Sequence, residues 1–292
     1  MADSLTFAPL ASRALIAVRG PGWRDFLQNL LTQDVESLRP GEARFGALLT
    51  PQGRLLHDLF IVGREDGCWL DVEAAQRQAL IQRLMIYRLR AKVEIAADPT
   101  DVAAVFPRAG GNPSGGSIAA GSAWAPVFAG VSGTWLADPR LPELGWRGYA
   151  AAAPAGATIG SEADYEAHRL AAGAPGPGDW GVERTYPIEA DFDLLNGIDF
   201  QKGCFVGQET TSRMKRRGQV KNRMLPIAFE GRPPAFGTEV MAGERRAGEV
   251  LTGREGRAMA LLRLDRIEGA ALSVDGRSVK VERPPWLHPR EA

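Results

Sequence analysis

One stretch of the sequence combines residue types that could carry chemistry. From Lys202 to Glu209 the chain reads Lys-Gly-Cys-Phe-Val-Gly-Gln-Glu, so that one of its two cysteines, Cys204, lies between two glycines. Gly203 and Gly207 permit backbone angles that are closed to other residues and let another group approach the main chain closely. We interpret the stretch as a shaped loop, because neither a solvated linker nor a plain core strand requires this combination.

The residues after this loop favour a reactive state of the cysteine. The run from Gln208 to Arg217 predicts a short helix, which would place Cys204 just before a helix N-terminus. The partial positive charge there favours the thiolate, the nucleophilic and metal-binding form of cysteine. Neighbouring cations would act in the same direction: Lys202, Arg213, Lys215, Arg216 and Arg217. The alternative is that Cys204 is buried and packs as a small apolar side chain, the commoner fate of a free cysteine.

Composition limits the classes of protein that the chain can belong to. A single core rarely grows past roughly 250–300 residues, so a chain of 292 residues is expected to form two or more lobes. Its 45% hydrophobic and 24% charged residues are ordinary for a soluble globular protein. Lys plus Arg and Asp plus Glu each number 35, and the formal net charge is zero. Binding to nucleic acid or to a membrane would therefore need a local patch of charge.

The cysteines and histidines do not form a recognisable metal or disulfide pattern. Cys68 and Cys204 lie far apart in the chain, which gives no support to a disulfide framework or a cysteine-rich zinc site. The three histidines, His57, His168 and His288, are widely spaced and none has a partner at ligand spacing. No metal site is predicted.

The ends of the chain and its apolar runs predict a location. The N-terminus lacks a basic region followed by an apolar run, so no signal peptide is expected. There is no stretch of 18 apolar residues, and a membrane span is not expected. We therefore expect a cytoplasmic protein with reduced thiols.

The first hundred residues predict an α+β lobe with an antiparallel sheet. Expected strands cover residues 14–18, 47–50, 55–62, 68–72 and 92–95, and expected helices cover residues 23–31 and 74–90. Residues 51–54, Pro-Gln-Gly-Arg, read as a hairpin turn between two of the strands.

The second half changes character near residue 222. Residues 107–126 are rich in Gly, Ala, Ser and Pro and predict a long loop, and residues 161–172 predict a helix. Six short apolar runs separated by glycine-containing turns then predict a small antiparallel β-barrel: residues 224–229, 239–241, 249–251, 258–264, 271–274 and 279–281. The expected division is an α+β region over residues 1–222 and a C-terminal barrel over residues 223–292.

The motif at residues 202–209 resembles the signature of the YgfZ family, Lys-Gly-Cys-Tyr/Phe-x-Gly-Gln-Glu. The resemblance extends over nearly the whole chain and is weakest between residues 100 and 160. Further matching segments are residues 26–35, residues 49–58, residues 87–93 and residues 237–264. The variant Pro187-Ile188-Glu189-Ala190, followed by Leu195-Asn196-Gly197, looks most like the alphaproteobacterial and mitochondrial branch.

The resemblance implies both a fold and a function. Members of the family are folate-binding relatives of the glycine-cleavage T-protein, and they assist iron–sulfur cluster assembly or repair. The implied fold is α+β: a three-lobed ring of two α+β lobes with antiparallel sheets and a C-terminal β-barrel. Tetrahydrofolate is the implied cofactor, and iron–sulfur proteins or their assembly machinery are the implied partners. The predicted cofactor contacts are Asp58, Glu189, Gly203, Gly207, Gln208 and Arg213.

Two departures from the T-protein pattern affect folate. The paired aspartates of its hairpin are here His57-Asp58, which leaves only the Asp58 carboxylate. The glutamate that grips the pterin ring is here Ala171, in Arg169-Leu170-Ala171-Ala172-Gly173. A methyl group cannot accept the two pterin N–H bonds, so aminomethyl transfer is not expected. Folate binding would need another acceptor, for which Glu189 is the candidate.

Three functions remain open from the sequence. The first is an accessory factor for iron–sulfur proteins in which Cys204 acts as a thiolate, Lys202 stabilises it, and Glu209 either holds Lys202 or accepts a proton. The second is a folate-dependent transferase that acts on tRNA through the basic run 213–223, which holds six Lys or Arg residues. The third is a binding module in which Cys204 only packs. Whether the protein is an enzyme is left open.

Overall fold

The computed structural model describes residues 5–108, 131–216 and 220–287. The chain forms two compact units, and each takes its residues from three separate segments. Unit 1 consists of Met1–Leu48, His57–His168 and Asn196–Val206, and unit 2 consists of Leu49–Leu56, Arg169–Leu195 and Gly207–Ala292. The loop expected over residues 107–126 lies mostly outside the described residues.

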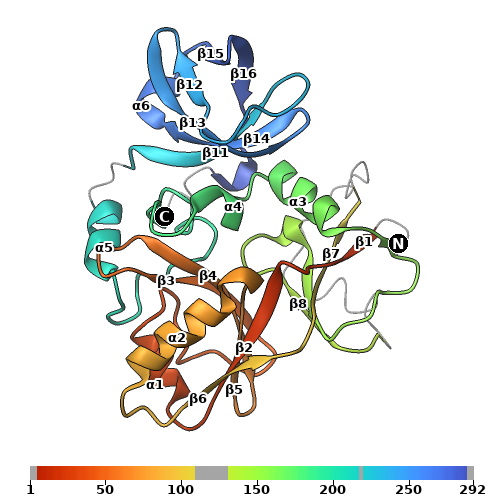
Figure 1. Ribbon diagram of the computed structural model, residues 1–292, viewed down its shortest axis with the longest axis vertical. Coiled ribbons are helices and arrows are strands. Elements are labelled where there is room, and N and C mark those ends of the chain that lie inside the picture. The colour runs from red at the N-terminus through yellow and green to blue at the C-terminus, as the bar shows by residue number, and fades with distance from the viewer. Residues whose placement is uncertain (1–4, 109–130, 217–219, 288–292) are drawn as a thin grey trace. The chain divides into compact units, whose positions relative to one another are not determined.

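The first sheet of unit 1 has five strands in the order β3-β4-β5-β2-β6 (Figure 1). The strands are β2 (Arg13–Arg19), β3 (Ala43–Leu49), β4 (Leu55–Arg64), β5 (Gly67–Glu73) and β6 (Glu94–Asp98). Two helices belong to this part of the chain: α1 (Trp23–Gln28) and α2 (Arg77–Arg88), which a 3-10 turn, Ala74–Gln76, precedes. Helix α2 buries Leu80, Ile81 and Leu84 and packs against β2 and β6. The predicted antiparallel α+β lobe is confirmed.

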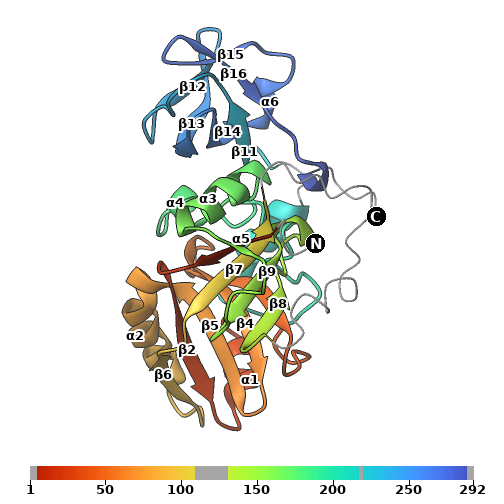
Figure 2. The same ribbon diagram turned by 90° about the vertical axis from the view of Figure 1, so that its right-hand side faces the viewer.

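A second five-stranded sheet in unit 1 has the order β10-β1-β7-β9-β8, and Figure 2 shows β7, β9 and β8 side by side. The strands are β1 (Leu5–Pro9), β7 (Val102–Pro107), β8 (Thr134–Ala137), β9 (Trp146–Tyr149) and β10 (Thr158–Ile159). The pair β1–β10 is parallel, and the others are antiparallel. Side chains of both sheets share one apolar core, which Leu15, Val62, Ala104, Phe106 and Tyr149 exemplify.

Charged side chains buried in unit 1 are paired with one another. The carboxylate of Asp71 accepts hydrogen bonds from Arg13 Nε at 2.7 Å and Arg147 Nη2 at 2.6 Å. Burial alone would raise the pKa of this carboxyl, but the two guanidinium groups outweigh it and hold the pKa of Asp71 below its ordinary value. The pairing lets β2, β5 and β9 bury charge without leaving it uncompensated.

Unit 2 contains a closed barrel of six strands in the order β11-β14-β13-β12-β15-β16. The strands are β11 (Asn222–Ala228), β12 (Glu239–Ala242), β13 (Arg245–Arg254), β14 (Arg257–Arg263), β15 (Leu272–Val274) and β16 (Arg277–Val281). Pairing of β16 with β11 closes the barrel, and side chains such as Leu225, Val250 and Leu262 fill it. The predicted barrel is confirmed, while the boundary at residues 222/223 stays a prediction.

The remaining elements are short. They are α3 (Glu162–Ala171), α4 (Pro177–Trp180), α5 (Gln208–Arg216), α6 (Leu264–Ile267) and the 3-10 turns Pro142–Leu144 and Pro285–Leu287. The helix expected to reach residue 31 was wrong at its end: α1 stops at Gln28, because Leu31 forms a β-bridge with Leu48 instead of continuing the helix. Among the described residues, no helix is long and apolar enough to span a membrane.

Candidate functional site

The first half of the motif lies in unit 1. Hydrogen bonds from Lys202 connect it to the turn that follows α1. The Lys202 Nζ donates hydrogen bonds to the main-chain oxygens of Gln28 and Leu31, both at 2.6 Å, and of Gln33 at 3.1 Å. The ammonium also lies 5.4 Å from the centre of the Phe205 ring. Three ammonium protons therefore meet three carbonyl acceptors in a buried position, and Lys202 acts first as an anchor for the loop.

Burial lowers the pKa of Lys202. Burial lowers the pKa of the Lys202 ammonium to about 8, against the opposing effect of the carboxylates of Asp34, Asp199 and Glu36. The predicted action of Lys202 on the Cys204 thiol stays a prediction. The contacts of the ammonium are with main-chain carbonyls, so its evident role is to position the loop.

Cys204 is exposed, and the residues on either side of it explain why. Lys202 and Phe205 are buried, while Gly203 and Cys204 between them face solvent. The other cysteine, Cys68, is buried in β5, and burial raises the pKa of its thiol. Of the two thiols, only Cys204 is open to a reagent or a partner, so Cys204 does not pack as a buried apolar side chain.

The residues just before the motif are tied to the same turn. The Asp199 side chain accepts hydrogen bonds from the main-chain N–H groups of Gln201 at 2.8 Å and Lys202 at 3.2 Å. The Asp199 main-chain N–H donates to Thr32 O at 2.9 Å, and Thr32 Oγ1 donates to Gly197 O at 2.7 Å. Sequence reasoning missed Asp199 and Thr32. Asp199 carried a usable signal, because an aspartate two residues before a turn position commonly bonds its own main chain.

The second half of the motif lies in unit 2, where Gly207 precedes α5. Gly207 has a φ of +81°, a region that favours glycine, and a Cβ added there would lie 2.7 Å from Thr50 O and 2.9 Å from the Cα of Gly53. The hairpin turn 50–54 thus lies directly against the main chain of Gly207. Gly203 differs, because a Cβ added there would meet nothing within 4 Å. Of the two glycines, only Gly207 lies so close to another segment that a side chain would not fit.

The charged residues of α5 pair within the helix. Glu209 forms an ion pair with Arg213 one turn later, and both side chains are exposed. Such surface pairs contribute only about 0.3–0.5 kcal/mol. Gln208 is the first residue of the helix and is half-buried. The structure therefore gives Glu209 a partner other than Lys202, whose own partners are the main-chain carbonyls.

The basic run 213–223 is partly neutralised by carboxylates of unit 2. Arg213 pairs with Glu209, and Arg223 contacts Asp191 at 2.7 Å and Asp193 at 2.9 Å. Arg217 lies outside the described residues. The run therefore presents fewer available cations than its sequence implies, and nothing in the described part of it favours an RNA contact.

The two carboxylates predicted to contact folate have other partners, and the position of the missing glutamate offers no polar atom. Asp58 is buried in unit 1 and pairs with Arg13 Nη1 at 2.9 Å. In unit 2, both oxygens of Glu189 accept hydrogen bonds, from Asn222 Nδ2 at 2.9 Å and from the N–H of Tyr186 at 3.1 Å. Ala171 ends α3 with a methyl group. These residues fit folate poorly, and folate binding stays a prediction.

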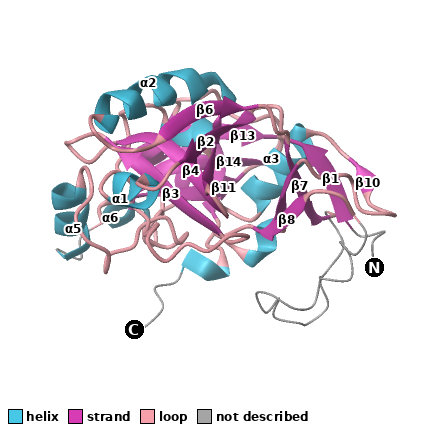
Figure 3. Cartoon of the chain, turned by 90° about the horizontal axis from the view of Figure 1, so that it is seen from below, coloured by secondary structure: helices cyan, strands magenta, loops and turns pink. Residues whose placement is uncertain are grey.

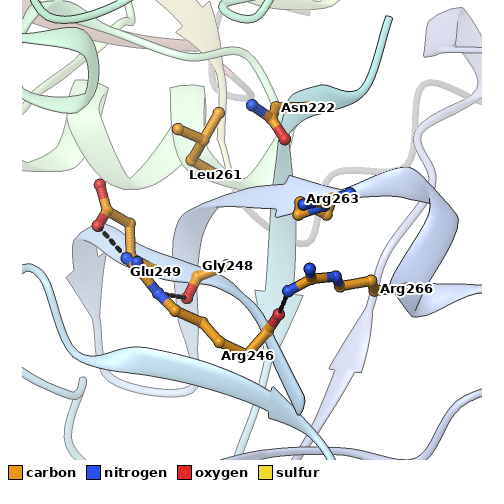
Figure 4. Close-up of a pocket in the computed structure, with 7 residues that line it drawn as sticks. All are labelled: Asn222, Arg246, Gly248, Glu249, Leu261, Arg263 and Arg266. Atoms are coloured by element: carbon orange, nitrogen blue, oxygen red, sulfur yellow. Dashed lines mark hydrogen bonds and ion pairs between the residues drawn. The ribbon is translucent and has the colours of Figure 1, made fainter. Parts of the chain in front are cut away.

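A pocket of about 290 Å³ lies on the outside of the barrel (Figure 4). Its cations are already bonded within unit 2: Arg246 to Glu249 at 2.8 Å, Arg263 to Asp265 at 2.8 Å, and Arg266 to the main-chain oxygen of Arg246. Because these guanidinium groups have partners, we do not assign the pocket a ligand. Within the described part of the chain, no group of three or more His, Cys, Asp or Glu side chains is placed to hold a metal ion.

Comparison with known proteins identifies the family. Residues 221–289 match the family model described as CAF17, C-terminal beta-barrel domain. The iron-sulfur cluster assembly factor IBA57, mitochondrial, of Homo sapiens is 31% identical over 284 residues, which cover 89% of this chain and 78% of that protein. This chain belongs to the IBA57 family. The IBA57 protein of Mus musculus is also 31% identical, over 289 residues, with 89% and 78% covered.

A solved structure confirms the fold of this IBA57-family chain. The crystal structure of glycine cleavage system aminomethyltransferase T from Bartonella henselae superposes with a TM-score of 0.75 at 20% identity, over 97% of this chain and 86% of that chain. The resemblance to the YgfZ family predicted a chain of this kind, with a T-protein-like fold and a C-terminal barrel. That coarser statement is confirmed by the match to IBA57.

One prediction is contradicted by the comparisons. The absence of a recognisable signal suggested a cytoplasmic protein, but the IBA57 relatives from human, mouse and Neurospora crassa are all named mitochondrial. The cytoplasmic location was therefore wrong. The reason is that the pattern considered was that of a secretory signal peptide, and lack of that pattern does not distinguish the cytoplasm from the mitochondrion.

Proposed function

We propose that this chain is an accessory factor in iron–sulfur cluster assembly and that Cys204 is its working residue. The role is supported by membership of a family whose human and mouse members are named iron-sulfur cluster assembly factors. The choice of Cys204 is supported by one observation. Its thiol is exposed, whereas Lys202 and Phe205 in the same loop are buried. A fixed, accessible thiol is suited to contact a partner protein or its cluster.

The chemistry proposed for Cys204 is ligand exchange at iron. Thiolates are the ligands that iron–sulfur clusters prefer. The cluster is the cargo, delivered by a partner. Cys204 gives its proton to solvent and forms an Fe–S bond, while one thiolate of the delivering protein leaves the same iron and takes up a proton. No electrons change hands, so the exchange needs neither an oxidant nor a reductant.

Two neighbouring residues have supporting roles in this proposal. Lys202 is a positioning residue, since its three bonds to carbonyl oxygens hold the loop that carries the thiol. Glu209 is the second residue of α5 and pairs with Arg213. A proton-accepting role for Glu209 stays a prediction, and the proposed exchange does not require it.

Tetrahydrofolate has no step in the proposed function. Asp58 and Glu189 have other partners, and Ala171 offers no acceptor. A transferase that acts on tRNA is not proposed either, because no described contact favours it. At the level of family branches, we propose the branch shared by alphaproteobacterial and mitochondrial members, on the basis of Pro187-Ile188-Glu189-Ala190 before Leu195-Asn196-Gly197.

The assembly role is tested by removing the protein from its host. In a strain that lacks this gene, we expect the activity of an iron–sulfur enzyme to fall, while the amount of its polypeptide and the activity of a metal-free enzyme stay constant. A plasmid copy of the wild-type gene should restore the activity. Equal iron–sulfur enzyme activity with and without the gene would contradict the assembly role.

A further inference from the structure

The C-terminal end of α2 exposes large apolar side chains. Met85, Ile86 and Leu89 are 41%, 73% and 87% exposed, and they account for half of the six exposed large apolar residues in the described part of the chain. We call these three residues the α2 end surface. In unit 1, α2 lies over β6 on the outer side of the first sheet (Figure 3). Scattered apolar residues need no explanation, but three within five residues form a patch.

The patch lies opposite the face by which α2 packs. The buried residues of the helix are Leu80, Ile81 and Leu84. At 3.6 residues per turn, the centre of that set and the centre of the exposed set lie roughly 140° apart around the helix axis. The apolar residues of the α2 end surface therefore face mostly away from the core of unit 1. An apolar face turned away from the core is typical of a contact with another molecule.

Leu89 has an unusual backbone for its type. It caps the helix with φ +40° and ψ −104°, in a region that favours glycine. The side chain at this strained position is also the most exposed of the three. A glycine or asparagine would end the helix with less strain. The leucine therefore gives the isolated unit no evident advantage, whereas it would give a partner a projecting apolar contact.

The segment that carries the patch is rich in cations and has no acidic residue. No Asp or Glu occurs in the sequence between Glu73 and Glu94. Four basic residues lie in or just after the C-terminal half of α2, and none of them forms an ion pair with a described residue: Arg83, Arg88, Arg90 and Lys92. An apolar centre with a rim of unpaired positive charge is complementary to a surface that carries carboxylates.

A hollow of about 440 Å³ lies beside the segment that follows α2 in unit 1. Its lining includes Pro21, Phe26, Ala91 and Lys92, so it lies between the start of α1 and the segment that follows α2. Asp25 is the one carboxylate in its lining. A concave hollow accepts a projecting side chain of a folded partner, which a lipid surface does not supply. The hollow therefore favours a protein as the occupant.

We propose that the α2 end surface and this hollow dock a partner protein whose surface presents an apolar side chain surrounded by carboxylates. The apolar side chain enters the hollow beside Ala91, and the carboxylates face Arg88, Arg90 and Lys92. The inference stands apart from the proposed role of Cys204, because it uses none of the residues of the cysteine loop.

The test uses a labelled acidic peptide as the probe. We would measure the fluorescence anisotropy of an 18-residue amphipathic peptide of Leu and Glu titrated with the full-length protein. We expect saturable binding that weakens as salt rises, and no binding by the peptide in which Lys replaces Glu. The double variants Ile86→Ser with Leu89→Ser and Arg88→Glu with Arg90→Glu should each weaken binding at least tenfold. Thermal unfolding would establish that both variants fold.

Ile159→Ser is the matched control, because Ile159 is also in unit 1 and is 67% exposed, close to the 73% of Ile86. Binding of the acidic peptide should be unchanged in this variant. The proposal is overturned if the acidic peptide does not bind, or if both double variants bind it like the wild type. It is also overturned if phosphatidylglycerol vesicles, or a second copy of the chain, engage the same residues in preference to the peptide.

Discussion

At the scale of single residues, His57 shows how burial couples protonation to stability. His57 is buried in β4, and burial lowers the pKa of its ring to about 4, against the nearby Asp58 and with a further lowering by Arg83. Its ordinary value is 6.5, so between pH 6.5 and pH 4 the unfolded chain binds more protons than the folded chain. The contribution of the neutral ring to stability is therefore full above pH 6.5 and is lost as the pH falls through 4.

We predict that the free energy of unfolding falls by up to about 3 kcal/mol from this group between pH 7 and pH 4. Urea titrations at pH 7, 5.5 and 4 measure the change. The variant His57→Gln cannot take up the proton, so its free energy of unfolding should fall by about 3 kcal/mol less between pH 7 and pH 4 than that of the wild type. This comparison does not depend on the stability of the variant at pH 7. Parallel pH dependence in the two proteins would contradict the assignment.

Lys202 gives a prediction about the loop that carries Cys204. In Lys202→Met, the stem can stay in place while the carbonyl oxygens of Gln28, Leu31 and Gln33 lose their donor. We expect the free energy of unfolding to fall by about 2–4 kcal/mol, since acceptors remain buried without a partner. Lys221→Met at an exposed position serves as the control and should change stability by less than about 0.5 kcal/mol. Equal stability of the two variants would show that the three bonds contribute nothing net.

Ala171 gives a prediction about folate. A carboxylate facing the pterin ring supplies two charge-assisted hydrogen bonds, together worth about 3 kcal/mol, which is roughly a hundredfold in affinity. The wild type is therefore expected to bind tetrahydrofolate weakly, and Ala171→Glu to bind it more tightly. Isothermal titration calorimetry of both proteins with tetrahydrofolate measures the two affinities. Tight binding by the wild type that Ala171→Glu does not change would mean that another group already grips the ring.

At the scale of elements, the two glycines of the motif are predicted to differ. In Gly207→Ala, the methyl group meets Thr50 O and the positive φ adds strain, so we expect a loss of about 1–3 kcal/mol in the free energy of unfolding. In Gly203→Ala, the methyl group meets open space, and the loss should be below about 1 kcal/mol. Chemical denaturation of both variants makes the comparison. Equal losses would show that the hairpin turn does not rest against Gly207.

The sequence predicted those elements whose own residues carry a strong pattern. The six barrel strands alternate apolar runs with glycine turns, and α2 lacks both glycine and proline in its interior. The resemblance implied a second antiparallel lobe, but the residue pattern did not locate its strands, because β8 and β9 have four residues each and β10 has two, too few to show a period. Its pairings also join distant segments, such as Thr6 with Thr158. Short strands of this kind depend on tertiary pairing more than on local propensity.

The sequence also predicted some features of the candidate site and not others. The motif drew attention to Cys204, and the residues after it predicted the helix α5. The partners of Lys202 could not be read from the sequence, since they are main-chain oxygens about 170 residues away. Carbonyl groups carry no residue identity, so no pattern of residue types could have identified them. The loop-positioning role of Lys202 therefore came from the structure, while its predicted action on the Cys204 thiol stays a prediction.

At the scale of the whole molecule, the chain passes between its two units several times. Each unit takes three separate segments, and the motif itself divides after Val206. Composition changes little at these points, and hence the sequence indicated only the start of the barrel near Asn222. The working residue proposed here, Cys204, therefore belongs to unit 1, whereas the helix that follows the motif belongs to unit 2.

The central claim is that the protein supports iron–sulfur cluster assembly through the exposed thiol of Cys204. The measurement is the activity of an iron–sulfur enzyme in a strain that lacks this gene and carries a plasmid copy of the wild type, Cys204→Ser or Cys68→Ala at equal protein levels. We predict that Cys204→Ser fails to restore activity, whereas Cys68→Ala, which removes the buried thiol, restores it. Full restoration by Cys204→Ser would contradict the claim.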